Sequence, residues 1–262
     1  MLPHNKGKQP GIMRSIGGGN HDLSGGMNRR PVVLIINRRR AFGFMAWLLA
    51  LVAGCSQPTW EATMQAGEAA MQRGNYAEAE RIFAVAVTRA EEAGLQDRRV
   101  AVTLSRLAQA YSSQGKYVEA EPVYLRALEI YQTVHGEEHL DVAATLNNLG
   151  VIHRMHGQYA DAQRLLMRAL HIKEKVLGTD HLDVALGLTN LATMYVSQGH
   201  YDQAAPLFRR AISIRETQLG SDHPDVAKTL EEYAALLRKS DQSAAAADVE
   251  MRAKAIRAKP PS

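Results

Sequence analysis

Apolar and polar positions recur along this chain every 42 residues, in three consecutive stretches that span residues 100–141, 142–183 and 184–225. Within each stretch the apolar residues first follow the spacing of an amphipathic helix. A Gly-x-Tyr segment then interrupts the pattern, and a second amphipathic helix follows. A fixed period of this size predicts an all-α array of antiparallel helix pairs, because one pair cannot bury its apolar face alone and must share it with its neighbours.

Equivalent positions of the three repeats carry residues of similar size. Two positions of each first helix hold leucine and are expected to form the core, and a nearby position is small, which lets two helices approach closely. A glycine after the first helix is typical of a residue with left-handed backbone at a helix end. The first leucine position holds Leu104, Leu146 and Leu188, and the second holds Leu107, Leu149 and Leu191. The small position holds Ala108, Gly150 and Ala192, and the glycines are Gly115, Gly157 and Gly199.

The ends of the array depart from this pattern. Residues 60–99 keep the second-helix residues but lack the leucines of the first helix, which predicts an N-terminal capping repeat. Residues 226–258 follow the repeat pattern at first and then depart from it, with Asp241 and Ser243 in the places of the glycine and the tyrosine. A polar last helix suits a C-terminal capping repeat whose outer face meets water. Residues 259–262 form a short tail.

The pattern resembles tetratricopeptide repeats of the kinesin-light-chain type. The resemblance rests on the glycines followed two residues later by Tyr117, Tyr159 and Tyr201, on the small residues of the second helix, and on the closing Leu-Gly-x-Asp-His-x-Asp-Val-Ala segment. It covers residues 100–239 closely. The resemblance implies a right-handed superhelix, an α-solenoid, whose first helices line a concave groove that binds other proteins.

By the same resemblance, specific residues of the first helices are expected to face the groove. An asparagine before the second leucine holds the main chain of an extended peptide in related proteins, and an amide suits this task because it both donates and accepts hydrogen bonds. Arg106 occupies that position in the first full repeat, where it is suited to a carboxylate. Alternatively, these are ordinary polar residues of a helix surface. The groove candidates are Arg106, Gln109, Asn147, Asn148, Arg154, Thr189, Asn190 and Thr193.

The basic character of the chain comes from its first residues. Residues 1–54 carry eight basic side chains and one acidic one, whereas the remaining residues carry 23 basic and 26 acidic side chains. The repeat region therefore has a net charge of −3 and offers no basic stripe to face phosphates, which argues against nucleic-acid binding.

The segment before the repeats is expected to be an export signal. Residues 1–26 form a Gly-rich, disordered leader or precede the true start at Met27, and residues 27–54 place an apolar run behind three arginines. The run ends in Val52-Ala53-Gly54-Cys55, which resembles the lipobox of bacterial lipoproteins. That resemblance implies palmitate on Cys55, a short tether at residues 55–59, and an outer-membrane, periplasmic location. An inner-membrane or cytoplasmic location, and general secretory or twin-arginine export, stay open.

No motif in the sequence indicates catalysis. It lacks a phosphate-binding loop, a nucleophile elbow and a dinucleotide fingerprint, and its one cysteine has no partner. His139, His181 and His223 precede Asp141, Asp183 and Asp225, which are expected to cap the following helices. Equivalent histidines of successive repeats should lie on the order of 20 Å apart, so they cannot share a metal. His135-Gly-Glu-Glu-His139 differs from a zinc-binding helix, and no metal or cofactor is expected.

These observations predict a non-enzymatic, lipid-anchored scaffold that binds a protein partner of the cell envelope in its groove. The sequence does not identify the partner. A self-associating structural protein, in which the apolar ends of the array form homo-oligomers, is the alternative from another class.

Overall fold

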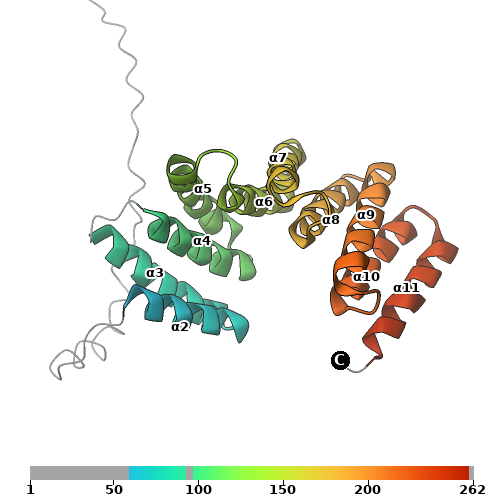
Figure 1. Cartoon of the computed structure of the whole chain (residues 1–262), viewed down its shortest axis with the longest axis horizontal. Helices are drawn as coiled ribbons and strands as arrows, with labels where there is room; N and C mark the ends of the chain where they lie inside the picture. Colours follow the sequence, from blue (N-terminus) through green and yellow to red (C-terminus); the bar gives the residue numbers. More distant parts are fainter. Residues whose placement is uncertain (1–58, 93–96, 260–262) are drawn as a thin grey trace, which may run out of the picture. The chain divides into compact units, whose positions relative to one another are not determined.

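The computed structural model describes residues 59–92 and 97–259. Within these residues the chain forms helices and turns and contains no strand (Figure 1). The helices are α2 (Trp60–Gln72), α3 (Tyr76–Glu92), α4 (Arg98–Ser113), α5 (Tyr117–His135), α6 (Leu140–Met155), α7 (Tyr159–Leu177), α8 (Leu182–Ser197), α9 (Tyr201–Leu219), α10 (Pro224–Lys239) and α11 (Ser243–Arg257). The predicted leader, the predicted signal and Cys55 lie outside the described residues.

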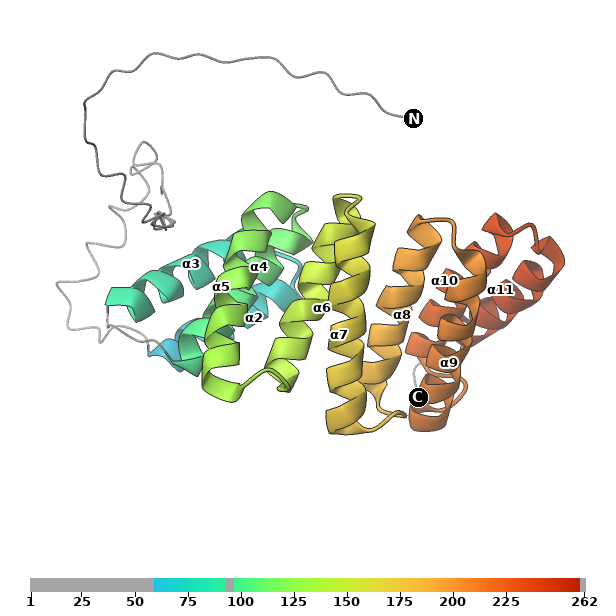
Figure 2. The ribbon, with the colours of Figure 1, turned by 90° about the horizontal axis from the view of Figure 1, so that it is seen from above.

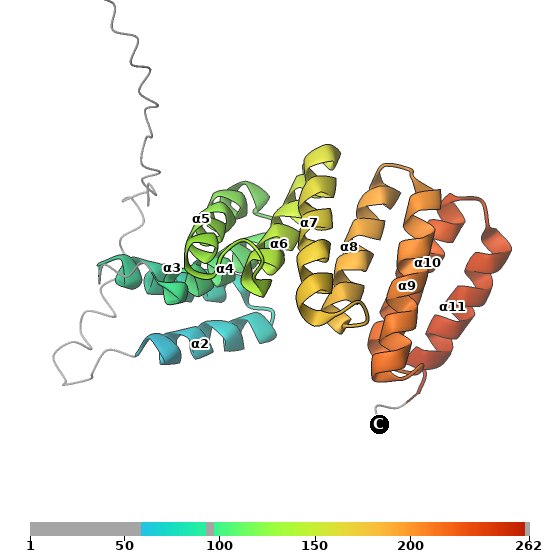
Figure 3. The same ribbon diagram turned by 45° about the horizontal axis from the view of Figure 1, so that its top comes forward.

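Successive helices pair as antiparallel hairpins. Each even-numbered helix packs against the odd-numbered helix that follows it, and that helix packs in turn against the first helix of the next pair. Figures 2 and 3 show the pairs following one another in chain order from α2 to α11. The predicted all-α, right-handed superhelix of antiparallel helix pairs is confirmed.

The core runs along the whole array between the helices. The leucines predicted to fill it are almost completely buried, and Leu146 and Leu188 are 1% and 0% exposed. The small position is equally important, because a Cβ atom on Gly150 would lie 2.7 Å from Cγ of Leu166 on α7. Close packing of helix pairs therefore depends on alternation of large and small residues, as in other protein interiors.

The turn inside each pair requires a left-handed backbone. Gly115, Gly157 and Gly199 have φ angles of 73°, 73° and 79°, a region that glycine enters without strain. In the last pair Asp241 takes the same place with φ of 59°. Aspartate tolerates this conformation better than most residues, so the degenerate last repeat keeps the turn although it has lost the glycine.

The helix caps correct one expectation. Asp141, Asp183 and Asp225 were expected to cap α6, α8 and α10, but these caps are formed by the histidines two residues earlier. Nδ1 of each histidine accepts the backbone N–H of the aspartate at 3.1 Å. The histidine has the extended backbone of a cap residue, whereas the aspartate already lies in the first helical turn. There its charge still complements the helix dipole.

Ion pairs on the exposed surface link each of the second helices α5, α7, α9 and α11 to the preceding second helix or to the turn that follows it. The pairs include Arg126 with Glu91, Arg168 with Glu137, Lys175 with Glu138, Arg210 with Glu174 and Arg252 with Glu216. Because the partners are largely solvent-exposed, each pair contributes about 0–1 kcal/mol. Many of the charged side chains of the repeat region are nevertheless explained by these pairs, which lie on a surface in contact with water.

No helix in residues 59–92 and 97–259 is both long and apolar enough to cross a bilayer.

Candidate functional site

The first helices of neighbouring pairs form one continuous surface. Helix α8 contacts α6 on one side and α10 on the other, in addition to the second helices that pack against it. Contact between successive first helices places them on the inner side of the curved array. The candidate site is therefore the exposed face of α4, α6, α8 and α10, which we call the inner surface.

One position of the first helix recurs along the inner surface. It holds Arg106, Asn148, Asn190 and Glu232, and all four side chains are half-buried. The column thus runs from a cation through two amides to a carboxylate. The ends of the column are charged and its centre is uncharged. What each of the four side chains can bind depends on the charges and hydrogen bonds around it.

The cation at the start of the column already has partners within the chain. Nε of Arg106 lies 3.1 Å from Oε1 of Glu68 on α2, and Nη1 donates to the side-chain oxygen of Gln109 at 3.1 Å. Arg106 therefore binds both Gln109 and the capping repeat. A carboxylate of a partner would have to displace Glu68 to reach the guanidinium.

The two amides in the centre of the column have different environments. Nδ2 of Asn190 donates to Oδ1 of Asn147, one repeat earlier, at 2.9 Å. Asn148 lies next to the hydroxyl of the buried Tyr124, whose pKa is raised by burial and lowered in part by hydrogen bonds to Ser112 and Asn148. Each of these two amides therefore contacts one neighbour within the chain and keeps further donors and acceptors for a ligand.

Two of the predicted groove residues do not face the groove. Asn147 and Thr189 are each only 6% exposed, because adjacent residues of a helix point about 100° apart. Asn147 bonds to Asn190 as described, and the hydroxyl of Thr189 donates to the carbonyl of Ala185 at 2.8 Å. The expectation that these two side chains line an open groove is wrong. Asn147 links α6 to α8 instead, and Thr189 is bonded within α8.

The other two candidates lie at the margin of the inner surface. Nη1 of Arg154 donates to the hydroxyl of Ser197 at 3.5 Å, which connects the ends of α6 and α8. The half-buried Thr193 donates to the carbonyl of Thr189 at 2.9 Å within its own helix. Both remain partly accessible to a partner.

A charged residue of a second helix, Arg215, reaches beneath the inner surface, and it was not predicted from the sequence. Arg215 of α9 donates to the hydroxyl of Thr189 at 3.1 Å and contacts the hydroxyl of Thr229. Near it, burial raises the pKa of Glu232, and Oε2 of this residue is shielded from solvent without a hydrogen-bond partner. The 42-residue alignment places Arg215 in register with Lys173 and Tyr131, and this polar position within an otherwise apolar helix face is the signal that could have revealed it.

The centre of the inner surface combines amides with exposed apolar groups. Leu186 of α8 and Met155 of α6 are 43% and 47% exposed, and Val151, one turn before Met155 on α6, is half-buried. No charged side chain occupies the positions of the described α6 and α8 that face the same way, which are Ala144, Asn148, Val151, Met155, Leu186, Asn190, Thr193 and Ser197. This uncharged strip is suited to main-chain and apolar groups.

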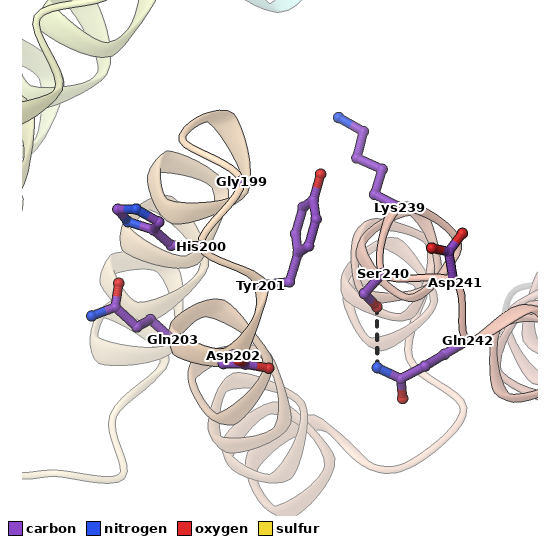
Figure 4. A pocket seen from close by; sticks show the side chains of 9 residues that line it. All are labelled: Gly199, His200, Tyr201, Asp202, Gln203, Lys239, Ser240, Asp241 and Gln242. Carbon is purple, nitrogen blue, oxygen red and sulfur yellow. Dashed lines mark hydrogen bonds between the residues drawn. The ribbon is translucent and has the colours of Figure 1, made fainter.

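A separate hollow of about 640 Å³ lies between the turns of the last two helix pairs (Figure 4). It is lined by residues 199–203 and 239–242. In the close-up the ring of Tyr201 stands between the two turns, and Nε2 of Gln242 donates to the hydroxyl of Ser240 at 3.1 Å. The hollow is open and polar, and its side chains do not form a nucleophile with an adjacent base, so it suggests no reaction.

The repeat geometry agrees with a comparison against known families. The model of the tetratricopeptide repeat matches residues 60–133, 99–175, 157–217 and 183–259, which together cover nearly the whole described region. The chain belongs to the tetratricopeptide repeat family. No curated protein matches the chain in sequence.

Several solved tetratricopeptide structures are similar to the array. One is BtubC (BKLC) from P. vanneervenii, with 27% identity, a TM-score of 0.66, and coverage of 86% of this chain and 88% of that one. A Podosopora anserina protein with nearly identical TPR-like repeats, named for the kinesin light chain, has 22% identity and a TM-score of 0.64 over 76% of this chain and 94% of that one. The Rap protein complexed with competence and sporulation factor has 16% identity and a TM-score of 0.65 over 81% and 59%.

These comparisons confirm the resemblance to tetratricopeptide repeats of the kinesin-light-chain type. The described region is thus a repeat scaffold suited to interaction between proteins. In such a scaffold the extended surface of stacked repeats, rather than an enclosed pocket, is the natural binding site.

Proposed function

We propose that this protein is a non-enzymatic scaffold that binds an extended segment of a protein partner on the inner surface of its two central repeats. The observation that carries the proposal is the uncharged strip on α6 and α8, where open amide groups lie beside exposed apolar side chains. Both neighbouring repeats have charged residues at the equivalent positions, Arg106 on one side and Lys228 and Glu232 on the other.

The chemistry of the strip matches an extended peptide. An extended chain presents unpaired N–H and C=O groups along its length, and Asn148 can donate to one and accept from the other. Leu186 and Met155 offer apolar surface to side chains that point toward the array. The positions of the strip itself carry no countercharge, and the guanidinium of Arg154 lies only at its end, beside Ser197. The preferred partner segment is therefore largely uncharged and partly apolar.

Substitution within the strip tests this proposal. Asn148→Ala, alone and with Asn190→Ala, and Leu186→Asp are compared with Gln203→Ala on the exposed face of α9, after crosslinking in cells and mass spectrometry of the recovered proteins. Partners should be retained by wild type and by Gln203→Ala and lost with Asn148→Ala and Leu186→Asp. An unchanged set of partners in all strip variants, with the fold intact by circular dichroism, would contradict the proposal.

We also propose that the scaffold is attached to the bacterial envelope by lipid on Cys55, on the periplasmic face of the outer membrane. The support is the lipobox-like segment Val52–Cys55 behind an apolar run. Four residues separate Cys55 from Trp60 at the start of α2, so the two Cα atoms can be at most about 17 Å apart. The repeats would therefore meet their partner close to the membrane surface.

Metabolic labelling tests the attachment independently of partner binding. Wild-type protein should incorporate labelled palmitate and fractionate with the outer membrane, because several acyl chains give effectively permanent anchoring. Cys55→Ser should remove the label and release the protein. A wild-type form without label in the soluble fraction would overturn the attachment while leaving the scaffold function untouched.

A further inference from the structure

Three potential metal ligands converge where the first full repeat joins the second. His135 is the last residue of α5, His139 caps α6, and Asp141 lies in the first turn of α6. One ligand atom from each of these residues lies within 4.8 Å of the other two. Among residues 59–92 and 97–259, this is the one group of three histidine, cysteine or acidic side chains that meets this condition.

The convergence arises from the turn between the helices. Gly136 ends α5 with φ of 81°, and the chain reverses within residues 136–139 so that His139 returns toward the end of the helix that His135 closes. The rings of His135 and His139 stack with their centroids 4.1 Å apart. The two histidines are four residues apart in sequence, but the turn rather than a helix face brings them together.

The equivalent junctions of the next two repeats lack this group. They retain the capping histidine and the aspartate, as His181 with Asp183 and His223 with Asp225. In the place of His135, however, they carry Leu177 and Leu219. The array thus accepts leucine at this position, and neither the fold nor the helix cap requires His135.

The atoms are spaced almost as a metal ion requires. Nε2 of His135 lies 3.7 Å from Oδ2 of Asp141, and Nδ1 of His139 lies 3.5 Å from the same oxygen. A tetrahedral zinc ion with bonds of about 2.0–2.1 Å separates its ligand atoms by about 3.3 Å. Small movements of the side chains would bring the atoms into coordination distance.

One of these atoms also lacks a hydrogen-bond partner. Nε2 of His135 is shielded from solvent and bonds to no other group in the described part of the chain. A buried polar atom without a partner is unfavourable, and a coordinate bond would satisfy it. Tyr131 stacks against His135 with a centroid distance of 6.2 Å and restrains the orientation of its ring.

We propose that His135, His139 and Asp141 bind a divalent transition metal ion, with zinc as the best-matched ion. Two imidazoles and one carboxylate form a donor set that suits zinc, whereas calcium and magnesium prefer a larger set of oxygen ligands. Three protein ligands leave a fourth position for water. The ion would connect the end of α5 to the start of α6 and so stiffen the junction between the first two full repeats.

Binding competes with two interactions present in the structure. Nδ1 of His139 accepts the backbone N–H of Asp141 at 3.1 Å, and Nε of Arg98 lies 3.4 Å from Oδ2 of Asp141. A ring nitrogen that coordinates an ion cannot also accept this N–H, so coordination through Nδ1 of His139 requires the cap bond to be given up. The affinity is therefore lower than that of a preformed structural zinc site.

Calorimetric titration of Zn²⁺ onto the purified full-length chain in detergent at pH 7.5 tests the proposal. Three variants are compared with wild type. His135→Leu installs the residue of the other two junctions, and His139→Asn removes a ligand but keeps a good capping residue. His181→Asn makes the same change at a junction without the second histidine and serves as the matched control.

Wild type and His181→Asn should bind one zinc ion with equal affinity, and His135→Leu and His139→Asn should each raise the dissociation constant at least about tenfold, as loss of a ligand requires. Thermal unfolding should divide the variants in the same way. Zn²⁺ should raise the unfolding midpoint only of the proteins that retain both His135 and His139. Equal affinity in His135→Leu and wild type, no saturable binding in wild type, or equally tight binding of Mg²⁺ would each overturn the proposal.

Discussion

The side-chain amide of Asn190 donates a 2.9 Å hydrogen bond to the side-chain oxygen of Asn147, across the boundary between two repeats. The bond links α6 to α8 beneath the inner surface, and Asn147 is almost completely buried. Asn147 and its sequence neighbour Asn148 therefore have different tasks. The first connects repeats, and the second is available to a partner.

Alanine substitutions at these two neighbours should separate stability from binding. Asn147→Ala removes the acceptor for the Asn190 amide in a buried place and should lower the free energy of unfolding by about 1–2 kcal/mol. Asn148→Ala removes a half-exposed amide and should change it by less than about 0.5 kcal/mol. Urea denaturation followed by circular dichroism measures both. Equal losses in the two variants would show that the Asn147–Asn190 bond has no special role.

The close approach of α6 and α7 leads to a second prediction. A methyl group on residue 150 would meet Cγ of Leu166 at 2.7 Å, and Leu166 is 1% exposed and cannot move aside. Gly150→Ala should therefore destabilise the array by about 1–2 kcal/mol, because overpacking exceeds the gain in helix propensity. The equivalent positions of the neighbouring repeats carry Ala108 and Ala192, and the residues in register with Leu166 there are Tyr124 and Phe208.

Gly187 of α8 provides a matched control for this substitution. Its added Cβ would meet Cδ1 of Leu170 at 3.3 Å, the far end of a flexible side chain. Gly187→Ala should be neutral or stabilising by a few tenths of a kcal/mol, since helix propensity then dominates. Thermal unfolding midpoints of the two variants test this difference. A higher midpoint for Gly150→Ala than for wild type would show that α6 and α7 do not need a glycine where they approach each other.

The 42-residue period was sufficient to predict the fold because it encodes packing directly. Leu104, Leu146 and Leu188 recur at a position that only the interior of a helix array can accommodate. The period also predicted the turns, since a glycine returns at each turn with positive φ except the last, where Asp241 takes its place. These features depend on local geometry and on contacts between adjacent repeats, and both are visible in a repeated sequence.

The details of the site were less predictable because they depend on rotations that the sequence does not show. Asn147 and Asn148 are neighbours, and only the packing angle between α6 and α8 decides which one is buried. The choice of His181 rather than Asp183 as the cap depends on where the helical backbone begins. The meeting of His135 with His139 depends on the turn at Gly136, which lies outside any helical spacing rule.

The histidine caps give a third prediction. His181→Ala removes the acceptor for the backbone N–H of Asp183 and should cost about 1 kcal/mol, whereas His181→Asn should cost much less because asparagine is a preferred cap. Asp183→Ala should have a smaller effect than His181→Ala, since its charge interacts with the helix dipole without capping the helix. Urea denaturation at one fixed pH measures the free energy of unfolding of the three variants. If Asp183→Ala had the larger effect, the aspartate would be the true cap.

The buried Lys173 gives a prediction that depends on pH. Its side chain is 5% exposed, and its ammonium donates to the carbonyl of Asp183 at 3.3 Å. Burial lowers the pKa of Lys173, an effect that the nearby charge of Asp183 partly offsets. Because the folded state disfavours the charged amine, Lys173→Met should stabilise the array at pH 7 by about 1 kcal/mol.

The sign of the pH dependence follows from the lowered pKa. Between the pKa of Lys173 in the folded chain and its value of about 10.4 in the unfolded chain, the unfolded state binds more protons. The stability contributed by this residue therefore rises with pH through that window, and the penalty is fully present below it. The difference in urea midpoint between Lys173→Met and wild type should shrink as the pH is raised from 7 to 10. Lys175→Met changes an exposed neighbour and should show no such trend, because its side chain is already in contact with water in the folded chain. A constant difference for Lys173→Met would mean that its amine is solvated in the folded chain.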